Sequence, residues 1–452
     1  MGDTIFSALE EGYTDPIRDV LWGHIYLTPA LAALTKSAPF MRLSRIAQLG
    51  PVSGVYPGAT HTRASHSIGV YHLGRRLLIN LSKRGAGDWL TPEGARSFLC
   101  ACLLHDLGHF PYTHSLKELP LESHESLTGK AILAEPLKSL IGAAGADPAF
   151  TAAIVDTSLG GNGGAESMDG GARGMDGGAR GMDGGARGMD GGVELLFYRK
   201  LLSGCLDPDK LDYLNRDARY CGVPYGAQDV DFILSRLYPD QKRGVDIDSR
   251  GIPSVESILF SKYLMYRTVY WHHSVRSATS MIKKALLRGL ETGVIAPEEL
   301  YNLDDQSLFS LMESRSGASP LFSLAAKVRE GALFSLAAEF PYNEEDHAPL
   351  LDIKNRSAHE NALAGKLSAA LGKTISGEDL IIDVPEPFTL ETGLYVRGEE
   401  CYFAESSSAF KTETVASFVK SLYVIRIYAD KPLESVIKSY SELKDILHIK
   451  RK

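Results

Sequence analysis

The chain has 452 residues, of which 44% are hydrophobic, and this is enough to bury a large core. Its formal net charge of −8 disfavours a general attraction to nucleic acid or to an anionic membrane. The five cysteines are widely spaced and form no Cys-x-x-Cys pair, which argues against a disulfide framework or a zinc knuckle. No apolar run approaches about 18 residues, so we expect a cytoplasmic protein that does not span a membrane.

Apolar residues recur at helical spacing through the first half of the chain. The segment Arg63–Arg84 places His66 and several apolar residues on one inward face. A second buried helix is predicted over Ala95–Leu107, with Gly108 as its stop signal. Residues 125–157 follow as two shorter predicted helices.

Residues 168–192 have low complexity, because Met-Asp-Gly-Gly-Ala-Arg-Gly occurs three times in tandem and a four-residue fragment follows. A period of seven could suggest a coiled coil, but each unit holds three glycines and no apolar pair. Each Arg is balanced by an Asp and no aromatic is interleaved, unlike an RGG-type nucleic-acid segment. We therefore predict a flexible surface loop over residues 160–192.

The second half of the chain changes character near residue 345. Helical spacing covers Leu195–Leu202, Asp209–Asp217, Val255–Thr268 and Ser277–Leu290. The tail carries β-rich segments at 380–384, 393–396, 401–403 and 422–428, with a helix near Thr412–Lys420. The polar run 341–346 is typical of a linker, so we predict a helical domain over residues 1–345 and an α+β lobe over residues 346–452. The expected fold class is mainly α.

Four side chains of metal-ligand type stand out: His66, the adjacent pair His105-Asp106, and Asp209. Adjacent side chains on a helix point about 100° apart, so the pair can bind one ion only where a helix ends. Two imidazoles and two carboxylates suit a divalent ion such as Zn²⁺, Mn²⁺, Fe²⁺ or Ni²⁺, with Mg²⁺ also open. Four protein ligands leave positions free for water and a phosphate oxygen.

The order of a histidine, a His-Asp pair and a distant aspartate resembles the HD superfamily of metal-dependent phosphohydrolases. The flanking motifs look like one branch of it, the deoxynucleoside triphosphate triphosphohydrolases, and these motifs are Gln48–Gly50, Tyr56–Ala59, Arg63–Val70, Leu104–His114 and Asp209–Asp217. This resemblance implies a helical HD core over about residues 60–217 and a small C-terminal lobe that packs between subunits. A homo-oligomer, either a dimer or a tetramer, is therefore expected.

The resemblance implies a dGTPase-like enzyme that hydrolyses deoxynucleoside triphosphates to a deoxynucleoside and inorganic triphosphate. Two alternatives stay open at this point. One is another HD phosphohydrolase, such as a nucleotide monophosphatase or a cyclic-nucleotide phosphodiesterase. The other is a non-catalytic nucleotide- or RNA-binding regulator, although the acidic balance of the chain makes a nucleic-acid partner unlikely.

Three histidines follow the pair, and the resemblance makes them catalytic candidates: His114 as the general acid, with His109 and His124 around the attacked phosphate. Histidine suits proton donation to a leaving 5′ oxygen because it titrates near pH 7. Relatives carry an acidic residue three positions after the general acid, where this chain has Lys117. Either the neighbouring Glu118 substitutes for it, or His114 lacks a carboxylate partner.

The resemblance also implies seven substrate contacts. On the phosphate side these are Arg63 and Lys210, and on the sugar side Gln48, Tyr213 and Asp217, with Tyr213 filling the place of a ribose 2′-hydroxyl. Arg267 and Tyr270 match positions near phosphate and base, and the competing interpretation of their segment is a buried aromatic stripe.

The segment before Gln48 differs from its relatives in a regulatory position. Vertebrate members of the branch bind guanine nucleotides there through acidic, glutamine and arginine side chains, and this chain has Lys36, Met41 and Ser44 instead. None of these can make the corresponding contacts. A one-residue shift of Arg42 or Arg45 could restore a phosphate contact only. We therefore expect activity that requires neither GTP nor dGTP.

Overall fold

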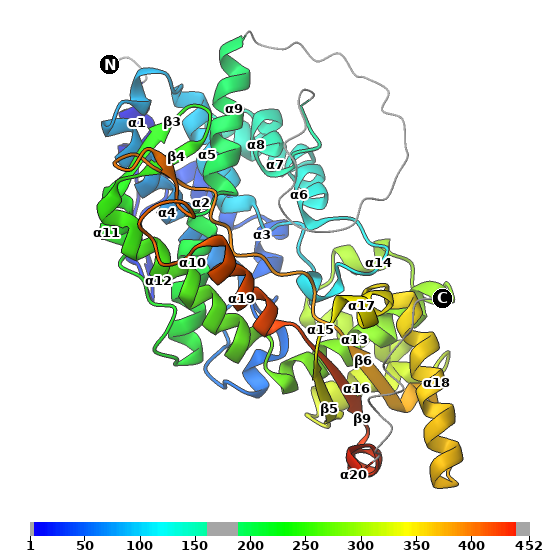
Figure 1. The fold of residues 1–452 in the computed structure, drawn as a ribbon. Helices are drawn as coiled ribbons and strands as arrows, with labels where there is room; N and C mark the ends of the chain where they lie inside the picture. Colours follow the sequence, from blue (N-terminus) through cyan, green and yellow to red (C-terminus); the bar gives the residue numbers. More distant parts are fainter. Residues whose placement is uncertain (1–3, 161–188, 440–452) are drawn as a thin grey trace.

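The computed structural model describes residues 4–160 and 189–439, and every structural statement below refers to them (Figure 1). The predicted repeat loop, residues 160–192, lies almost wholly outside this part of the chain. Helix α9 (Met189–Leu202) includes the last four residues of that prediction, so the helix begins earlier than the expected Leu195.

The first two thirds of the chain are helical, with two pairs of short strands. Their helices are α1 (Ile5–Glu10), α2 (Pro29–Thr35), α3 (Ala38–Leu43), α4 (Arg63–Lys83), α5 (Pro92–Leu104), α6 (His124–Leu133), α7 (Leu137–Ala143), α8 (Pro148–Val155), α9, α10 (Pro208–Cys221), α11 (Val230–Arg236), α12 (Ile252–Met265), α13 (His273–Glu291), α14 (Glu298–Tyr301), α15 (Asp305–Ser314) and α16 (Ser323–Arg329). The strands are β1 (Ile17–Asp19), β2 (Gly23–Ile25), β3 (Leu237–Asp240) and β4 (Gly244–Ile247).

The rest of the chain mixes helices and strands. Its elements are β5 (Ser335–Pro341), α17 (Glu344–His347), α18 (Ile353–Leu371), β6 (Leu380–Asp383), β7 (Tyr395–Val396), β8 (Cys401–Tyr402), α19 (Thr412–Leu422), β9 (Val424–Ala429) and α20 (Lys431–Ser439). The mainly α fold with a small C-terminal α+β lobe is therefore confirmed, and the four β-rich segments and the helix near 412–420 are found where the sequence predicts them.

Helices α5 and α10 both pack against α4, and the three helices position the candidate site. Helix α4 begins at Arg63 as predicted, because Thr62 caps it by accepting a hydrogen bond from the Ser65 amide. Helix α5 ends at Leu104, three residues before the predicted end. The pair His105-Asp106 therefore lies just beyond a helix end, where both side chains can turn inward.

Gly108 has a different role from the predicted stop signal. A Cβ atom added at this position would lie 2.1 Å from the carbonyl oxygen of His124 and 2.7 Å from the amide of Thr128. Glycine is therefore required because α6 approaches the backbone closely. This close approach brings His124, the first residue of α6, next to the turn that follows α5.

The C-terminal segment belongs to two different sheets. Strands β5, β9 and β6 form a three-stranded antiparallel sheet, whereas β7 pairs parallel to β4 and extends the β3–β4 hairpin of the helical region. The chain thus returns from the lobe to the helical core, where Phe418 of α19 packs against Phe260 and Tyr263 of α12 (Figure 1). The predicted domain boundary at residue 345 falls after β5 but before β6 and β9. It would therefore divide this three-stranded sheet between the two domains. The two-domain division stays a prediction.

Membrane-spanning structure was not expected from the sequence. Within the described residues, every helix is too short or too polar to cross a bilayer.

Candidate active site

The structure brings the four predicted ligands together from α4, the turn after α5, and the first turn of α10. His66 Nε2 lies 2.9 Å from Asp209 Oδ1. His105 Nε2 lies 3.3 Å from Asp106 Oδ1 and 3.7 Å from Asp209 Oδ1. One ligand atom each from His66, His105 and Asp106 lies within 4.8 Å of the others. These three side chains could hold one divalent ion, and Asp209 lies beside both imidazoles.

The donor set fits a metal ion. His66 donates from Nδ1 to Asp212 Oδ2 (2.8 Å) and His105 donates from Nδ1 to the Cys102 carbonyl (3.0 Å), so each ring turns Nε2 toward the cluster. His105 Nε2 is buried and has no hydrogen-bond partner among the described residues. Burial opposes protonation of His66, yet the carboxylates of Asp209 and Asp212 raise its pKa to about 10. The site therefore stabilises positive charge, as a cation site must.

Asp212 is the residue that orients His66, and the sequence analysis missed it. Arg216 donates to both of its oxygens (2.8 and 2.9 Å), and the Trp22 indole donates to Oδ1 (2.6 Å). A Cβ atom at Gly69 would lie 1.9 Å from Asp212 Oδ1, so this glycine lets α4 approach α10. A sequence signal existed, because Asp212 lies one helical turn after Asp209 and Gly69 lies one turn after His66.

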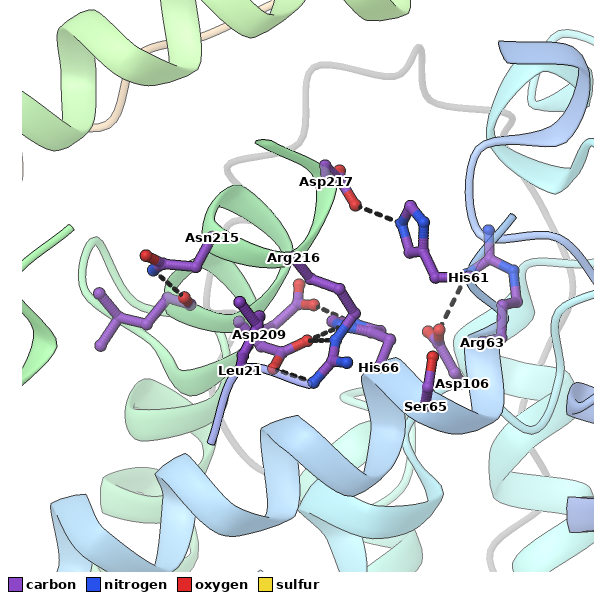
Figure 2. A network of polar contacts seen from close by, with 12 residues as sticks. Leu21, His61, Arg63, Ser65, His66, Asp106, Asp209, Asn215, Arg216 and Asp217 are labelled. Carbon is purple, nitrogen blue, oxygen red and sulfur yellow. Dashed lines mark hydrogen bonds and ion pairs between the residues drawn. The ribbon is translucent and has the colours of Figure 1, made fainter. Parts of the chain in front are cut away.

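Arg63 contacts a metal ligand in this structure. Its guanidinium Nη1 donates to Asp106 Oδ2 at 2.8 Å, and both side chains are buried (Figure 2). This pairing fixes one oxygen of Asp106 and leaves the other near the imidazoles. Arg63 therefore orients Asp106, and the predicted phosphate contact stays a prediction.

The three candidate catalytic histidines form one cluster beside Asp106. The ring centre of His109 lies 4.8 Å from that of His114 and 4.0 Å from that of His124. The Nε2 atoms of His109 and His114 are 3.1 Å apart, and His109 Nδ1 is 3.1 Å from Asp106 Oδ1. Burial is the main cause that lowers the pKa of all three, to about 3 for His124 and well below the usual value for the others. Burial therefore favours the neutral form of these three rings.

Glu118 does not serve as the carboxylate partner of His114. Its carboxylate accepts from Lys283 at 2.5 Å and from both terminal nitrogens of Arg356. Lys283 lies on α13 and Arg356 on α18, so Glu118 ties the chain just after His114 to the C-terminal lobe. The hypothesis that Glu118 replaces the missing acidic residue is therefore wrong.

Lys210, the second predicted phosphate contact, is paired within the chain, and its contact to phosphate stays a prediction. Its amine lies 2.7 Å from Asp207 Oδ2 and 3.1 Å from Glu391 Oε2. A second lysine, Lys262 of α12, lies 3.6 Å from Glu391 Oε1 and donates to the Thr389 carbonyl at 3.0 Å. The sequence analysis missed Lys262 and Glu391, because they are distant from Lys210 in the chain and match no local pattern.

The predicted sugar contacts gather at the other end of α10. Asp217 accepts from the Tyr270 hydroxyl at 2.6 Å and from His61 Nε2 at 2.8 Å, the latter visible in Figure 2. The backbone amide of Gln48 donates to the His61 carbonyl at 3.0 Å. The side-chain Oε1 atom of Gln48 is buried and has no hydrogen-bond partner among the described residues. Tyr213 is half-buried between these groups and Asp209. Each of these roles stays a prediction.

Arg267 is placed differently from the other predicted contacts. Its guanidinium donates to the Tyr263 hydroxyl at 2.5 Å, and Tyr263 in turn packs against Phe418 of α19. It lies at the start of a π-helical turn, Tyr266–Tyr270, that continues α12. The structure thus pairs Arg267 with a tyrosine of α12, and its contact to phosphate or base stays a prediction.

The arginines that precede Gln48 are also engaged within the chain. Arg42 donates to the carbonyls of Leu107, His109 and Leu303, and burial is the main cause that lowers its pKa to about 10. Arg45 forms an ion pair with Asp304 at 2.6 Å. Arg42 therefore holds the backbone of the turn that follows α5, and its guanidinium is already engaged within the chain.

Comparisons with known proteins identify two family regions in this chain. Residues 63–141 match the HD domain family, and residues 229–452 match the family described as the HD associated region. An uncharacterized protein of Methanocaldococcus jannaschii is 29% identical over 299 residues, which are 66% of this chain and 54% of that protein. The uncharacterized protein YwfO of Bacillus subtilis is 32% identical over 249 residues, 55% of this chain and 49% of its own length. The chain thus spans about half the length of these relatives.

Two further comparisons concern a named activity and the fold. The deoxynucleoside triphosphate triphosphohydrolase SAMHD1 of Danio rerio is 39% identical over 104 residues, which are 22% of this chain and 17% of that protein. The crystal structure of a phosphohydrolase from Bacteroides thetaiotaomicron shares the fold with a TM-score of 0.67 at 22% identity, over 92% of this chain and all of that one. The chain therefore belongs to the HD superfamily of phosphohydrolases, and within it resembles the deoxynucleoside triphosphate triphosphohydrolase branch.

Proposed function

We propose that the protein is a divalent-metal-dependent hydrolase that converts deoxynucleoside triphosphates to deoxynucleosides and inorganic triphosphate. The observation that carries the proposal is the set of side chains along helix α10. Within its first three turns it presents a metal-type ligand (Asp209), a buried cation (Lys210), and the pair Tyr213 and Asp217. These are the chemical groups needed to hold, in order, a reacting phosphorus, a phosphate tail and a sugar.

His66, His105, Asp106 and Asp209 would hold the ion. When bound, a divalent ion lowers the pKa of water and polarises a phosphoryl oxygen. Positioning and neutralisation of phosphate charge supply most of the catalysis in phosphoryl transfer, and Lys210 serves both purposes.

The histidine cluster would donate a proton to the leaving 5′ oxygen. His114 is the expected donor, and His109 and His124 pack on its ring. The triphosphate brings negative charge next to these buried rings, which favours the protonated form. Proton donation thereby becomes coupled to substrate binding.

The test is a metal-supplemented hydrolysis panel of dNTPs, NTPs, dNMPs and cyclic nucleotides, with separate detection of triphosphate, pyrophosphate and orthophosphate. Release of intact triphosphate from dNTPs is the expected result. Orthophosphate from dNMPs, or opening of cyclic nucleotides, would overturn the proposal in favour of another HD phosphohydrolase. Nucleotide binding without any product would indicate a regulator.

The same proposal includes a cytoplasmic homo-oligomer, dimer or tetramer, whose activity needs no guanine nucleotide. The expected result is dTTP hydrolysis of equal rate with and without GTP or dGTP, across several protein concentrations. Strict dependence on the guanine nucleotide would contradict it. Light scattering coupled to size exclusion measures the subunit number directly.

A further inference from the structure

The chain between β6 and β7, residues 384–394, runs from the C-terminal lobe back to the helical core. We refer to it as the 384–394 segment. It is anchored by the buried side chains of Phe388, Leu390 and Leu394, and the Phe388 amide donates to the Tyr423 hydroxyl at 2.6 Å. The thiol of Cys205, just before α10, donates to the Glu391 carbonyl at 3.0 Å. The backbone of this segment is therefore fixed against the phosphate side of the site.

Glu391 is the side chain that this segment directs to the phosphate side. Its two oxygens reach different lysines, Oε2 to Lys210 at 3.1 Å and Oε1 to Lys262 at 3.6 Å. The lysine side chains are 14% and 9% exposed, whereas that of Glu391 is 28% exposed. The carboxylate therefore covers the two amines from the solvent side.

Two carboxylates face the two lysines. Asp207 contacts Lys210 at 2.7 Å, and Glu391 contacts both amines. Asp207 cannot leave, because it is 2% exposed and caps α10 by accepting from the Lys210 amide at 2.6 Å. Glu391 belongs to no helix and is held through its side chain by the lysines alone among the contacts above. It is the exchangeable anion of the group.

We propose that Glu391 occupies a phosphate subsite, and that a substrate's distal phosphates must displace its carboxylate from Lys210 and Lys262. The inference rests on the proposed function and identifies a specificity-determining residue of the same site. A carboxylate and a phosphate oxygen form equivalent charge-assisted hydrogen bonds with an ammonium group, so they compete for it. A phosphate tail carries more charge than one carboxylate and wins this competition, whereas a ligand with a single phosphate has no distal phosphate to displace Glu391.

The experiment compares Glu391→Gln with the unchanged protein in the presence of the metal. Inorganic triphosphate, titrated by calorimetry, is expected to bind about tenfold more tightly to the variant, since a competing charge pair is removed. The KM for dNTPs should fall by a similar factor, and inhibition by dNMPs should be unchanged. Glu391→Ala covers the case in which the amide still blocks the subsite by its volume, and melting curves check that both variants fold.

The matched control is Glu345→Gln, which removes one negative charge from an exposed position on α17. It should leave triphosphate binding unchanged. An unaltered affinity in both Glu391 variants, weaker binding in them, or an equal gain in Glu345→Gln would overturn the inference. Binding of inorganic triphosphate requires no hydrolysis. A protein that binds it more tightly in Glu391→Gln but does not cleave dNTPs would therefore refute the proposed function and leave this inference standing.

Discussion

The metal-ligand side and the phosphate side of the site differ in where their partners come from. On the metal-ligand side, the ligands and the residues that orient them all belong to the helical core: Asp212 of α10 bonds His66 of α4, Arg63 of α4 bonds Asp106, and the Cys102 carbonyl of α5 accepts from His105. On the proposed phosphate side, Lys210 has a local counter-charge, Asp207, and a second one, Glu391, which comes from the 384–394 segment. One half is therefore organised within the helical core, whereas the other also depends on how the 384–394 segment packs against it.

The largest expected effect breaks the metal-ligand side. Replacing His105 and Asp106 together by alanine removes half of the ligand set. Bound metal, measured by elemental analysis, and hydrolysis should both fall to background. Full activity in the metal-stripped double variant would refute the assignment of this cluster as the metal site.

A milder change separates the ligands from the residue that orients them. Asp212→Asn keeps the shape of the side chain but weakens its hold on His66, so metal affinity should fall roughly 10–100-fold. Competition with a chelator measures this affinity. The control is Asp231→Asn, whose side chain is 82% exposed and pairs only with Arg76 among the contacts described. An equal loss in both variants would show that Asp212 has no specific role.

Acid should lower the stability of the protein by breaking the ion pairs of Glu386. Burial opposes ionisation of Glu386, but Arg276 (2.6 Å) and Lys283 (2.9 Å) lower its pKa to about 2. A depressed pKa contributes stability above the unfolded value of 4.5, and this contribution is lost as the pH falls toward about 2. The loss is roughly 3 kcal/mol in the free energy of unfolding. Denaturant titrations from pH 6 to 3 should show a smaller pH dependence for Glu386→Gln, and equal slopes would contradict the assignment.

The selection of deoxyribose over ribose tests the predicted role of Tyr213. Replacing Tyr213 by alanine opens the space where a ribose 2′-hydroxyl would lie. The ratio of kcat/KM for ribonucleotides to that for deoxynucleotides should rise about tenfold. Tyr225→Ala, at a tyrosine that instead bonds Thr268, is a matched control. An unmoved ratio in the Tyr213 variant would exclude it as the sugar gate.

The smallest effect is expected from the glycine-rich repeat. Deleting Met168–Gly188 shortens the connection to α9, and a change of loop length costs only tenths of a kcal/mol. Rates should stay within about twofold of the full chain. A tenfold loss would show that the repeat contributes to the site.

Much of the fold, and three residues that could hold a metal ion, could be predicted from the sequence. Helix α4 and the strands β6 to β9 carry periodic patterns within one element, and the order of His66, His105-Asp106 and Asp209 carries the chemistry. The flanking motifs identified the superfamily for the same reason, because each is a short run of neighbouring residues.

Only the tertiary structure decided how those residues are partnered. Glu118 was a candidate partner of His114 by its position in the sequence, but α13 and α18 bring Lys283 and Arg356 to it. In the same way, Lys262 and Glu391 meet Lys210 because α12 and the 384–394 segment pack against α10. Such ion pairs join side chains that are remote in the chain, and a charged residue has the same local sequence signature whether it faces solvent or a buried partner. The candidate ligands can therefore be found from the sequence alone, whereas the ion pairs around Lys210 depend on how the 384–394 segment packs against α10 and α12.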